Sequence, residues 1–283
     1  MARRLMTPAD LLGPYLSAEW DARKLSLADA AAVASFPDTS VASGARTGPA
    51  VDGAQTNGSI QPAYSATGLN GYPCVVGNGS QWLDLSNVAS LPFGTNPVTI
   101  ITLAQGVRAG PGNRVLLQWG SGFYGSPSNH LWGQKGSSNS EPWWYTDYGG
   151  GTDDTYGLTD IVDSPSLAIL GIARAGTPLG TLAVNDSQEY SKSWGNSPIG
   201  STSGRLFYTT TGDCNPFIGK LGYSAVVSRL ITPAEWQKLD AILLWGFGLQ
   251  AKLAADNPDR NAAPTVDDGV AIIRRRPVML LAS

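Results

Sequence analysis

Charged residues are scarce in this chain, and neither sign dominates. Lys, Arg, Asp and Glu make up 14% of the 283 residues, and the net charge is −3. Soluble domains ordinarily carry about 25% charged residues, so neutral polar side chains and glycine must cover much of this surface. The one basic run, Arg274–Arg276, is more typical of a solvated flank than of a phosphate-binding surface. We therefore expect no nucleic acid partner.

Residues that usually carry metal or nucleophilic chemistry are also few. The chain has one histidine, His130, and two cysteines, Cys74 and Cys214. A single histidine excludes any site that needs two. The cysteines are too far apart for a disulfide framework or a zinc-binding spacing. We interpret both as small buried residues, and a single bridge between them is the open alternative.

Glutamate is rare as well, which bears on hydrolysis. The four glutamates are Glu19, Glu141, Glu189 and Glu235. A retaining glycoside hydrolase holds two carboxyl groups about 5–5.5 Å apart, and residues i, i+2 and i+4 of a strand share one face. Glu19 and Asp21 begin such a pattern, but Arg23 stands at the next position. We predict that the chain is not an enzyme.

Long apolar runs are missing too. The longest apolar stretches have the length of strands, so we expect no membrane-spanning helix and no membrane partner. Arg3 and Arg4 near the start are not followed by an apolar segment, so we expect no signal peptide. On this basis the protein remains where it is made or leaves the cell by lysis.

Glycine and proline, in contrast, are plentiful. The 34 Gly and 19 Pro, with 42% apolar residues, favour many short strands joined by turns. Segments 98–104, 115–119 and 166–173 are rich in Val, Ile and Leu and predict strands. Residues 179–184 and 188–190 flank Asn185-Asp186-Ser187, which predicts a hairpin.

The end of the body combines a strand with a helix. Phe217, Leu221, Tyr223, Ala225 and Val227 alternate with other residues, which predicts a half-buried antiparallel strand.

The helix follows at once. Thr232-Pro233-Ala234-Glu235 has a capping residue, a proline at the first helical position and a glutamate that completes a capping box. Trp236, Leu239 and Leu243 form an apolar stripe. We expect Gly246 and Gly248 to end the helix.

We expect one domain with two short extensions. Residues 1–14 form an N-terminal arm with a helical turn capped by Thr7, and residues 15–252 form the body. Residues 253–283 form a tail that ends in the apolar stretch 278–282. Such an end is unfavourable in water, so we expect the tail to dock on a neighbouring subunit.

Three stretches of the body carry a family resemblance. They are residues 217–235 with the ending Leu243-Leu244-Trp245-Gly246-Phe247-Gly248-Leu249, residues 68–76 with Gly79-Ser80-Gln81-Trp82-Leu83-Asp84-Leu85, and residues 16–21 with 33–38. Together they resemble concanavalin A-like lectin/glucanase (laminin-G-like) domains. The resemblance implies an all-β fold: a concanavalin A-like antiparallel β-sandwich, or jelly roll, with one C-terminal amphipathic helix. These motifs are structural and say little about a ligand.

An aromatic stretch between residues 130 and 160 is the candidate binding site. The residues that we assign to it are Trp132, Trp143, Trp144, Tyr145, Tyr148 and Asp147. Sugar rings pack their C–H faces on aromatic rings, and their hydroxyl groups hydrogen-bond with carboxylates and amides. Packing of these aromatic side chains in the core is the alternative, and it stays open.

The same stretch contains Asp153 and Asp154. Laminin-G-like domains can hold calcium on their rim loops, so the resemblance offers a calcium site at these two residues. Turn formation in a glycine-rich loop explains them equally well. Apart from calcium we expect no cofactor.

The resemblance extends to domains on the head and tail appendages of tailed phages. It implies a non-catalytic virion structural or adhesion protein, located in the virion, whose lectin-like domain binds host surface polysaccharide. Its partners would be other virion proteins, reached through the arm and the tail, within a homo-oligomer. A free carbohydrate-binding lectin module is the alternative, and a glycoside hydrolase is a less favoured third reading.

Overall fold

The computed structural model describes most of the secondary structure of the chain. The described residues are 3–92, 96–107, 114–120, 130–134, 144–146, 155–156, 164–173, 179–185, 187–193, 203–208 and 215–267. Two large sheets and a two-stranded ribbon account for all strands in these segments.

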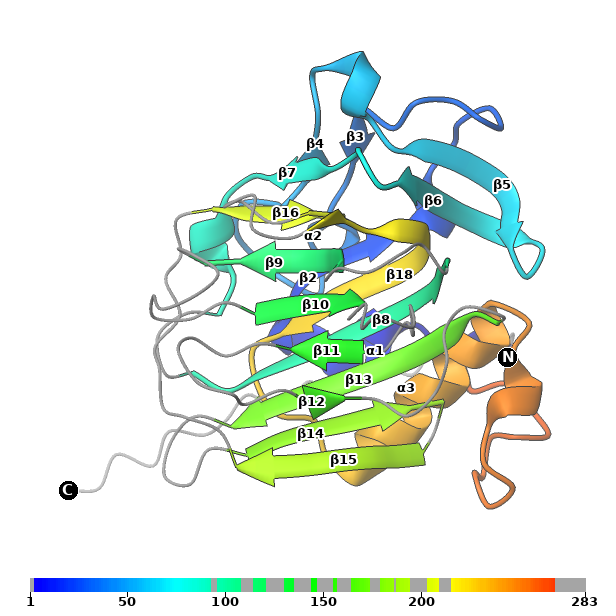
Figure 1. The fold of residues 1–283 in the computed structure, drawn as a ribbon. Helices are drawn as coiled ribbons and strands as arrows, with labels where there is room; N and C mark the ends of the chain where they lie inside the picture. The colour runs from blue at the N-terminus through cyan, green and yellow to red at the C-terminus, as the bar shows by residue number, and fades with distance from the viewer. Residues whose placement is uncertain are drawn as a thin grey trace.

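One large sheet has nine strands, and β16, β9, β10 and β11 follow one another down Figure 1. In order, its strands are β12 (Thr155–Tyr156), β11 (Trp144–Thr146), β10 (His130–Gln134), β9 (Arg114–Trp119), β16 (Gly204–Leu206), β7 (Leu83–Leu85), β4 (Gly53–Ala54) and β3 (Ser35–Phe36), with β17 (Asn215–Pro216) beside β9. All pairs are antiparallel except β17 with β9.

The other large sheet has eight strands and is antiparallel throughout. In order, its strands are β15 (Ser187–Ser193), β14 (Leu179–Val184), β13 (Ser166–Ala173), β8 (Val98–Gly106), β18 (Ile218–Val227), β6 (Tyr72–Asn78) and β5 (Ala63–Leu69), with β2 (Leu16–Asp21) paired to β18. The strands predicted from apolar runs are confirmed as β8, β9 and β13. The predicted hairpin is confirmed as β14–β15, and Asn185 takes a φ of 48° in its turn.

The two sheets enclose the main core. Leu83, Leu206 and Leu117 lie in register across β7, β16 and β9 and are fully buried. They belong to one apolar cluster with Ile100 and Leu170 from the eight-stranded sheet. Because alternate residues of a strand point to opposite faces, these leucines define the inner face of the nine-stranded sheet. The fold is a β-sandwich, as predicted.

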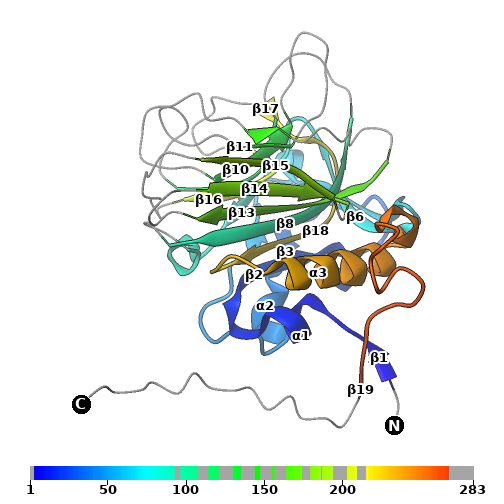
Figure 2. The same ribbon diagram turned by 90° about the horizontal axis from the view of Figure 1, so that it is seen from below.

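A helical layer covers the outer face of the eight-stranded sheet. The predicted helix is confirmed as α3 (Pro233–Gly246), with Thr232 and Glu235 forming the capping box. It packs on β13, β8 and β18, on the side of their sheet away from the nine-stranded sheet (Figure 2). Leu239 and Leu243 are fully buried there, and each such side chain stabilises the fold by about 1.5–3 kcal/mol.

The prediction of a half-buried strand at residues 217–227 is wrong. Nearly all of β18 is buried on both faces, because this central strand packs on the main core on one side and under α3 on the other. A register shift between Leu221 and Tyr223 also divides the predicted single face. Leu221 enters the main core, and Tyr223 enters the cluster under α3. At Gly222, a Cβ would lie 2.5 Å from the side chain of Leu69, so any other residue would displace buried side chains at this crossing.

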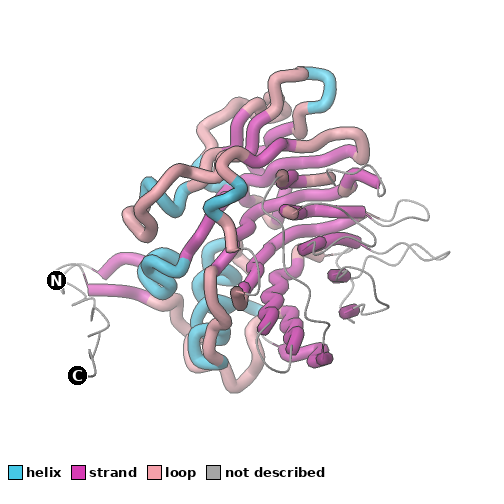
Figure 3. Tube along the Cα trace, turned by 90° about the vertical axis from the view of Figure 1, so that its left-hand side faces the viewer, coloured by secondary structure: helices cyan, strands magenta, loops and turns pink. Residues whose placement is uncertain are grey.

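The ends of the described chain meet. Strands β1 (Arg3–Leu5) and β19 (Thr265–Asp267) form an antiparallel ribbon that projects from the sandwich (Figure 3). The predicted turn capped by Thr7 is confirmed as α1 (Pro8–Leu12). The boundaries proposed for arm, body and tail stay a prediction.

Short helical segments complete the fold. They are α2 (Thr39–Ala42) and the 3-10 turns η1 (Gly13–Tyr15), η2 (Ala22–Lys24), η3 (Gly58–Ile60), η4 (Val88–Ser90) and η5 (Gln250–Lys252). Within the described segments, no helix has the length and apolar character needed to cross a membrane.

Candidate functional site

The predicted aromatic site lies at one end of the nine-stranded sheet, and only its strand backbone is described. Trp132 lies in β10, in register with Leu117, while Trp144 and Tyr145 lie in β11. Outside the described residues lie the rest of this site, Trp143, Asp147 and Tyr148, and the two residues of the predicted calcium site, Asp153 and Asp154. Glycan binding by this stretch therefore stays a prediction.

A second group of aromatic and charged side chains lies on the same sheet and is described in full. We call Trp82, Asp84, Arg205 and Tyr208 the outer-face cluster. Asp84 and Arg205 lie in register across β7 and β16, one position away from the leucines of the core. This offset places them on the face that points away from the core.

The four side chains contact one another closely. Arg205 Nε donates to Asp84 Oδ1 at 2.6 Å. The guanidinium carbon lies 5.1 Å from the ring centre of Trp82 and 5.8 Å from that of Tyr208. The two rings are 5.3 Å apart and tilted by 42°. The Asp84 side chain is 54% exposed and that of Arg205 is 23% exposed, so the carboxylate is open to solvent beside two half-buried rings.

Tyr208 reaches the outer face through an unusual backbone conformation. Strand alternation would turn Phe207 outward, as it does Arg205. Instead Phe207 has a φ of 70°, is fully buried, and packs 6.2 Å from the ring of Phe217. Such a conformation in a bulky residue costs on the order of 1–3 kcal/mol and persists only where the surroundings impose it. Because Phe207 turns into the core, the next residue, Tyr208, lies on the outer face beside Trp82.

Hydrogen bonds of the backbone fix Trp82 and the loop that precedes it. Its backbone N–H donates to the carbonyl of Ile60 at 3.1 Å. In the loop before it, Gln81 Oε1 accepts from the Asn78 N–H at 3.0 Å. Within the described part of the chain, the buried Nε1 of Trp82 has no hydrogen-bond partner. Trp82 packs against the main core, and its unpaired N–H is unusual because a buried indole N–H usually finds a partner.

Only two of the four residues of this cluster have a signal in the sequence. Trp82 and Asp84 fall in a motif of the resemblance, which implies a structural role for them. No sequence pattern singles out Arg205 or Tyr208. These two come from a distant part of the chain, and only the pairing of β16 with β7 brings them to the site. A charged residue two positions after a tryptophan was the one local signal.

Metal and thiol chemistry find no support in the described residues. They contain no group of three or more His, Cys, Asp or Glu side chains that could hold a metal ion. Cys74 is buried and free, as interpreted from the sequence, and burial raises the pKa of its thiol to about 11. A thiol of that kind is inert. Cys214 lies outside the described residues, and calcium binding stays a prediction.

No family model matches the chain, and no curated protein matches it in sequence. Solved structures match it in fold. The binding domain of Paraclostridial Mosquitocidal Protein 1 is 14% identical with a TM-score of 0.53, over 81% of this chain and 52% of that one. Domain 4 of AbnA, a GH43 extracellular arabinanase from Geobacillus stearothermophilus in complex with arabinotriose, is 14% identical with a TM-score of 0.52, over 81% and 99%.

A third match is a sialidase. The Trypanosoma rangeli enzyme in complex with sialic acid is 10% identical with a TM-score of 0.51, over 81% of this chain. The chain spans only 33% of that sialidase. Identities this low show the fold alone, and the fold that they share with this chain is a β-sandwich.

Proposed function

We propose that the chain is a non-catalytic glycan-binding protein whose outer-face cluster binds a neutral, hydroxyl-rich saccharide. The observation that carries the proposal is the exposed Asp84 carboxylate, held by Arg205 beside the rings of Trp82 and Tyr208. A sugar ring packs its C–H face on such rings. Neighbouring hydroxyl groups donate to Asp84 and accept from Arg205.

The charge of the cluster favours a neutral sugar. Asp84 and Arg205 offset each other, and the more exposed of the two is the carboxylate. An acidic saccharide would place its own carboxylate or sulfate beside Asp84, and like charges repel at this range. The fold is compatible with the proposal, since the matching domain 4 of AbnA is in complex with arabinotriose, a neutral saccharide.

Glu235 and Glu19 are the glutamates whose side chains the structure describes, and their placement supports binding over hydrolysis. Glu235 caps α3 and receives hydrogen bonds from Thr232 and Arg229. Glu19 is 6% exposed and receives hydrogen bonds from Thr39 and Tyr223. Neither glutamate belongs to the outer-face cluster, which holds one carboxylate, whereas a glycoside hydrolase uses a pair.

We propose further that the protein serves as an adhesin in a virion, with host surface polysaccharide as its ligand. The projecting β1–β19 ribbon supports contacts with other subunits, since Leu5 on it is 59% exposed. A free lectin module is the alternative. Light scattering distinguishes them, because a virion component forms a ring or trimer and a free module is a monomer.

The glycan proposal is tested by binding of the labelled protein to immobilised neutral polysaccharides. We expect saturable binding that weakens at least tenfold, or about 1.4 kcal/mol, in Tyr208→Ala. The matched control is Tyr15→Ala, which removes a 46% exposed tyrosine that also lies beneath an arginine, Arg229. Equal losses in both variants, or no saturable binding to any polysaccharide, would overturn the proposal.

A further inference from the structure

A cavity of about 590 Å³ lies where the N-terminal segment crosses the sandwich. Its walls are residues 5–9, parts of β2, η2 and α2, the end of α3, and residues 263–264. No residue of the outer-face cluster lines it. The volume is in the range of cavities that bind small molecules.

Two buried carboxylates line this cavity, and one of them, Glu19, has no ion pair among the described residues. Glu19 accepts hydrogen bonds from Thr39 Oγ1 at 2.6 Å and from the Tyr223 hydroxyl at 2.9 Å, and both donors are neutral. Among the described residues, no lysine or arginine forms an ion pair with Glu19. Burial is the main cause that raises the pKa of this carboxyl group. A cation that reached Glu19 would therefore relieve an unfavourable buried charge.

The other charged groups of the lining do not supply that cation. Arg23 donates to both oxygens of Asp21, at 2.8 and 2.7 Å, so this pair is neutral overall. Arg23 Nη1 also donates to the carbonyl of Gly246 at 3.2 Å, which holds the guanidinium against the end of α3. Lys24 is exposed to solvent. Arg23 also lowers the pKa of Glu19, but Asp21 raises it by more, so the Arg23–Asp21 pair does not compensate the charge of Glu19.

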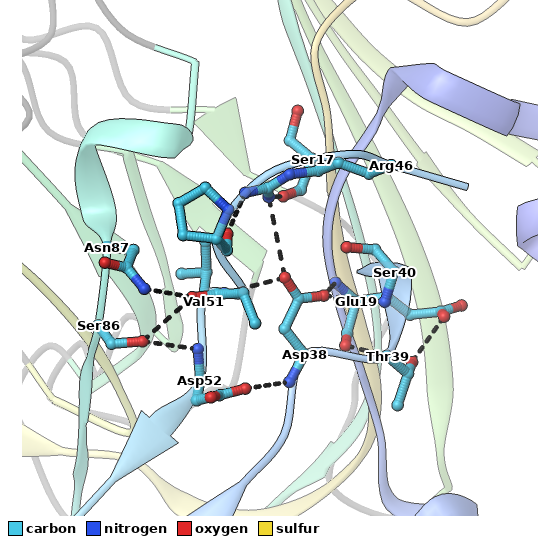
Figure 4. Close-up of polar contacts among 12 residues, drawn as sticks. Ser17, Glu19, Asp38, Thr39, Ser40, Arg46, Val51, Asp52, Ser86 and Asn87 are labelled. Atoms are coloured by element: carbon cyan, nitrogen blue, oxygen red, sulfur yellow. Dashed lines mark hydrogen bonds and ion pairs between the residues drawn. The ribbon is translucent and has the colours of Figure 1, made fainter. Parts of the chain in front are cut away.

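The position of Glu19 is fixed by the surrounding fold. Asp38 accepts from the backbone N–H groups of Glu19, Ser40 and Val51 at 2.9, 2.9 and 3.0 Å (Figure 4). Arg46 lies 3.8 Å from the same carboxylate. This network ties β2 to α2, so Glu19 and its partner Thr39 are held in place without help from a ligand. Such rigidity lowers the cost of binding.

Much of the remaining wall is apolar. Leu5, Pro8, Ile242 and Pro264 contribute aliphatic surface, and Trp245 adds an aromatic side chain. The indole of Trp245 donates to the carbonyl of Asp259 at 2.8 Å, so its position is fixed as well. A ligand that fits this lining combines one polar group with an apolar skeleton.

We infer that the cavity binds a small organic ammonium ion, a primary amine with an apolar carbon skeleton. Its NH₃⁺ group donates to Glu19, and its skeleton contacts Ile242 and Trp245. An alcohol would leave the charge of Glu19 uncompensated, and a carboxylate would be repelled by it. This activity is separate from the proposed glycan binding and does not depend on it.

The test is calorimetry and ligand-observed NMR on the full chain, with three probes of similar shape: cyclohexylmethylamine, cyclohexylmethanol and cyclohexanecarboxylate. We expect saturable binding of the amine, at least tenfold tighter than the alcohol, and no binding of the carboxylate. Glu19→Gln keeps the size and a hydrogen-bond acceptor but removes the charge, so the preference for the amine should disappear. Similar affinities for amine and alcohol, or an unchanged preference in Glu19→Gln, would overturn the inference.

A second variant guards against a folding defect in the first. Ala42 lines the cavity from α2 and is exposed, so Ala42→Trp fills space without removing a described contact of the core. Amine binding should be lost in Ala42→Trp while the thermal unfolding transition is retained; unchanged amine binding in a folded Ala42→Trp protein contradicts the inference. Tyr208→Ala should keep amine binding, and Glu19→Gln should keep polysaccharide binding, so the two proposals fail independently.

Discussion

Arg23, Asp21 and Phe247 combine an arginine, a carboxylate and an aromatic ring beside the cavity, and two further places in the described part of the molecule do the same. In the outer-face cluster, Arg205 pairs with Asp84 beside Trp82. Near the start of α3, Arg229 pairs with Glu235 at 2.5 Å, and its guanidinium lies 4.6 Å from the ring centre of Tyr15. Composition alone does not distinguish the two groups.

The two carboxylates differ in how many of their hydrogen bonds serve the fold. Glu235 also accepts from the N–H and the hydroxyl of Thr232, at 2.9 and 3.0 Å, and so closes the capping box of α3. Asp84 accepts from Arg205 alone among the described residues, and its side chain is more exposed. The helix accounts for the first group, whereas the described hydrogen bond of the second carboxylate joins it only to Arg205 on the neighbouring strand. This difference is why we assign binding to the outer-face cluster.

The largest expected effect comes from the residue that shapes the outer-face cluster. Phe207→Ala should destabilise the protein by about 3–5 kcal/mol, because it removes a buried ring. Phe207→Gly should be less destabilising than Phe207→Ala by about 1 kcal/mol, since glycine adopts a φ of 70° without strain. At Phe217, which does not have a positive φ, the order of the two variants should reverse. Urea denaturation measures all four; the same order at both positions would refute a strained backbone at Phe207.

The next largest effect is expected at the capping box of α3, which contains Glu235. Thr232→Ala removes the capping hydroxyl of α3 and should lower the free energy of unfolding by about 1 kcal/mol. Polysaccharide affinity should stay at the wild-type value, because this group has no part in binding. Parallel urea titrations and binding assays check both statements. Loss of affinity in this variant would show that the two regions are not independent.

The features that could be predicted from the sequence are those with local signals. The capping box and apolar stripe specify α3 within a dozen residues, and Asn185 marks the β14–β15 turn. The two faces of β18 could not be predicted, because the shift next to Gly222 depends on Leu69 and Phe247 from other parts of the fold.

The outer-face cluster was harder to predict for the same reason. Trp82 and Asp84 stand close in sequence, but Arg205 and Tyr208 join them only through the pairing of β16 with β7. The placement of Tyr208 depends in addition on the positive φ of Phe207, which no pattern of residue types indicates. The site therefore depends on the pairing of strands that are distant in sequence and on the strained backbone of Phe207.

A pH dependence separates the two carboxylates further. The hydrogen bond from Arg229 is the main cause that lowers the pKa of Glu235 from 4.5 to about 2. Because the pKa is lower in the folded state, this stabilisation is fully present above about pH 4.5 and is lost as the pH falls through about 2. The Glu235 side chain is 23% exposed, and screening by solvent keeps the amount small. The stability difference between wild type and Glu235→Gln in urea should therefore shrink over this range, and a constant difference would contradict the assignment.

The smallest effect on stability is expected from Asp84→Asn. This variant tests whether the Asp84 carboxylate, unlike that of Glu235, acts in binding. The pair with Arg205 is largely exposed at the carboxylate, so its loss should change the free energy of unfolding by less than about 0.5 kcal/mol. Polysaccharide affinity should nevertheless fall about tenfold, because asparagine offers sugar hydroxyls a weaker, neutral acceptor. Thr232→Ala gives the opposite pattern, a loss of stability with full binding. If Asp84→Asn bound polysaccharide like the wild type, the exposed carboxylate would have no role in recognition, and the two arginine clusters would differ only in what they do for the fold.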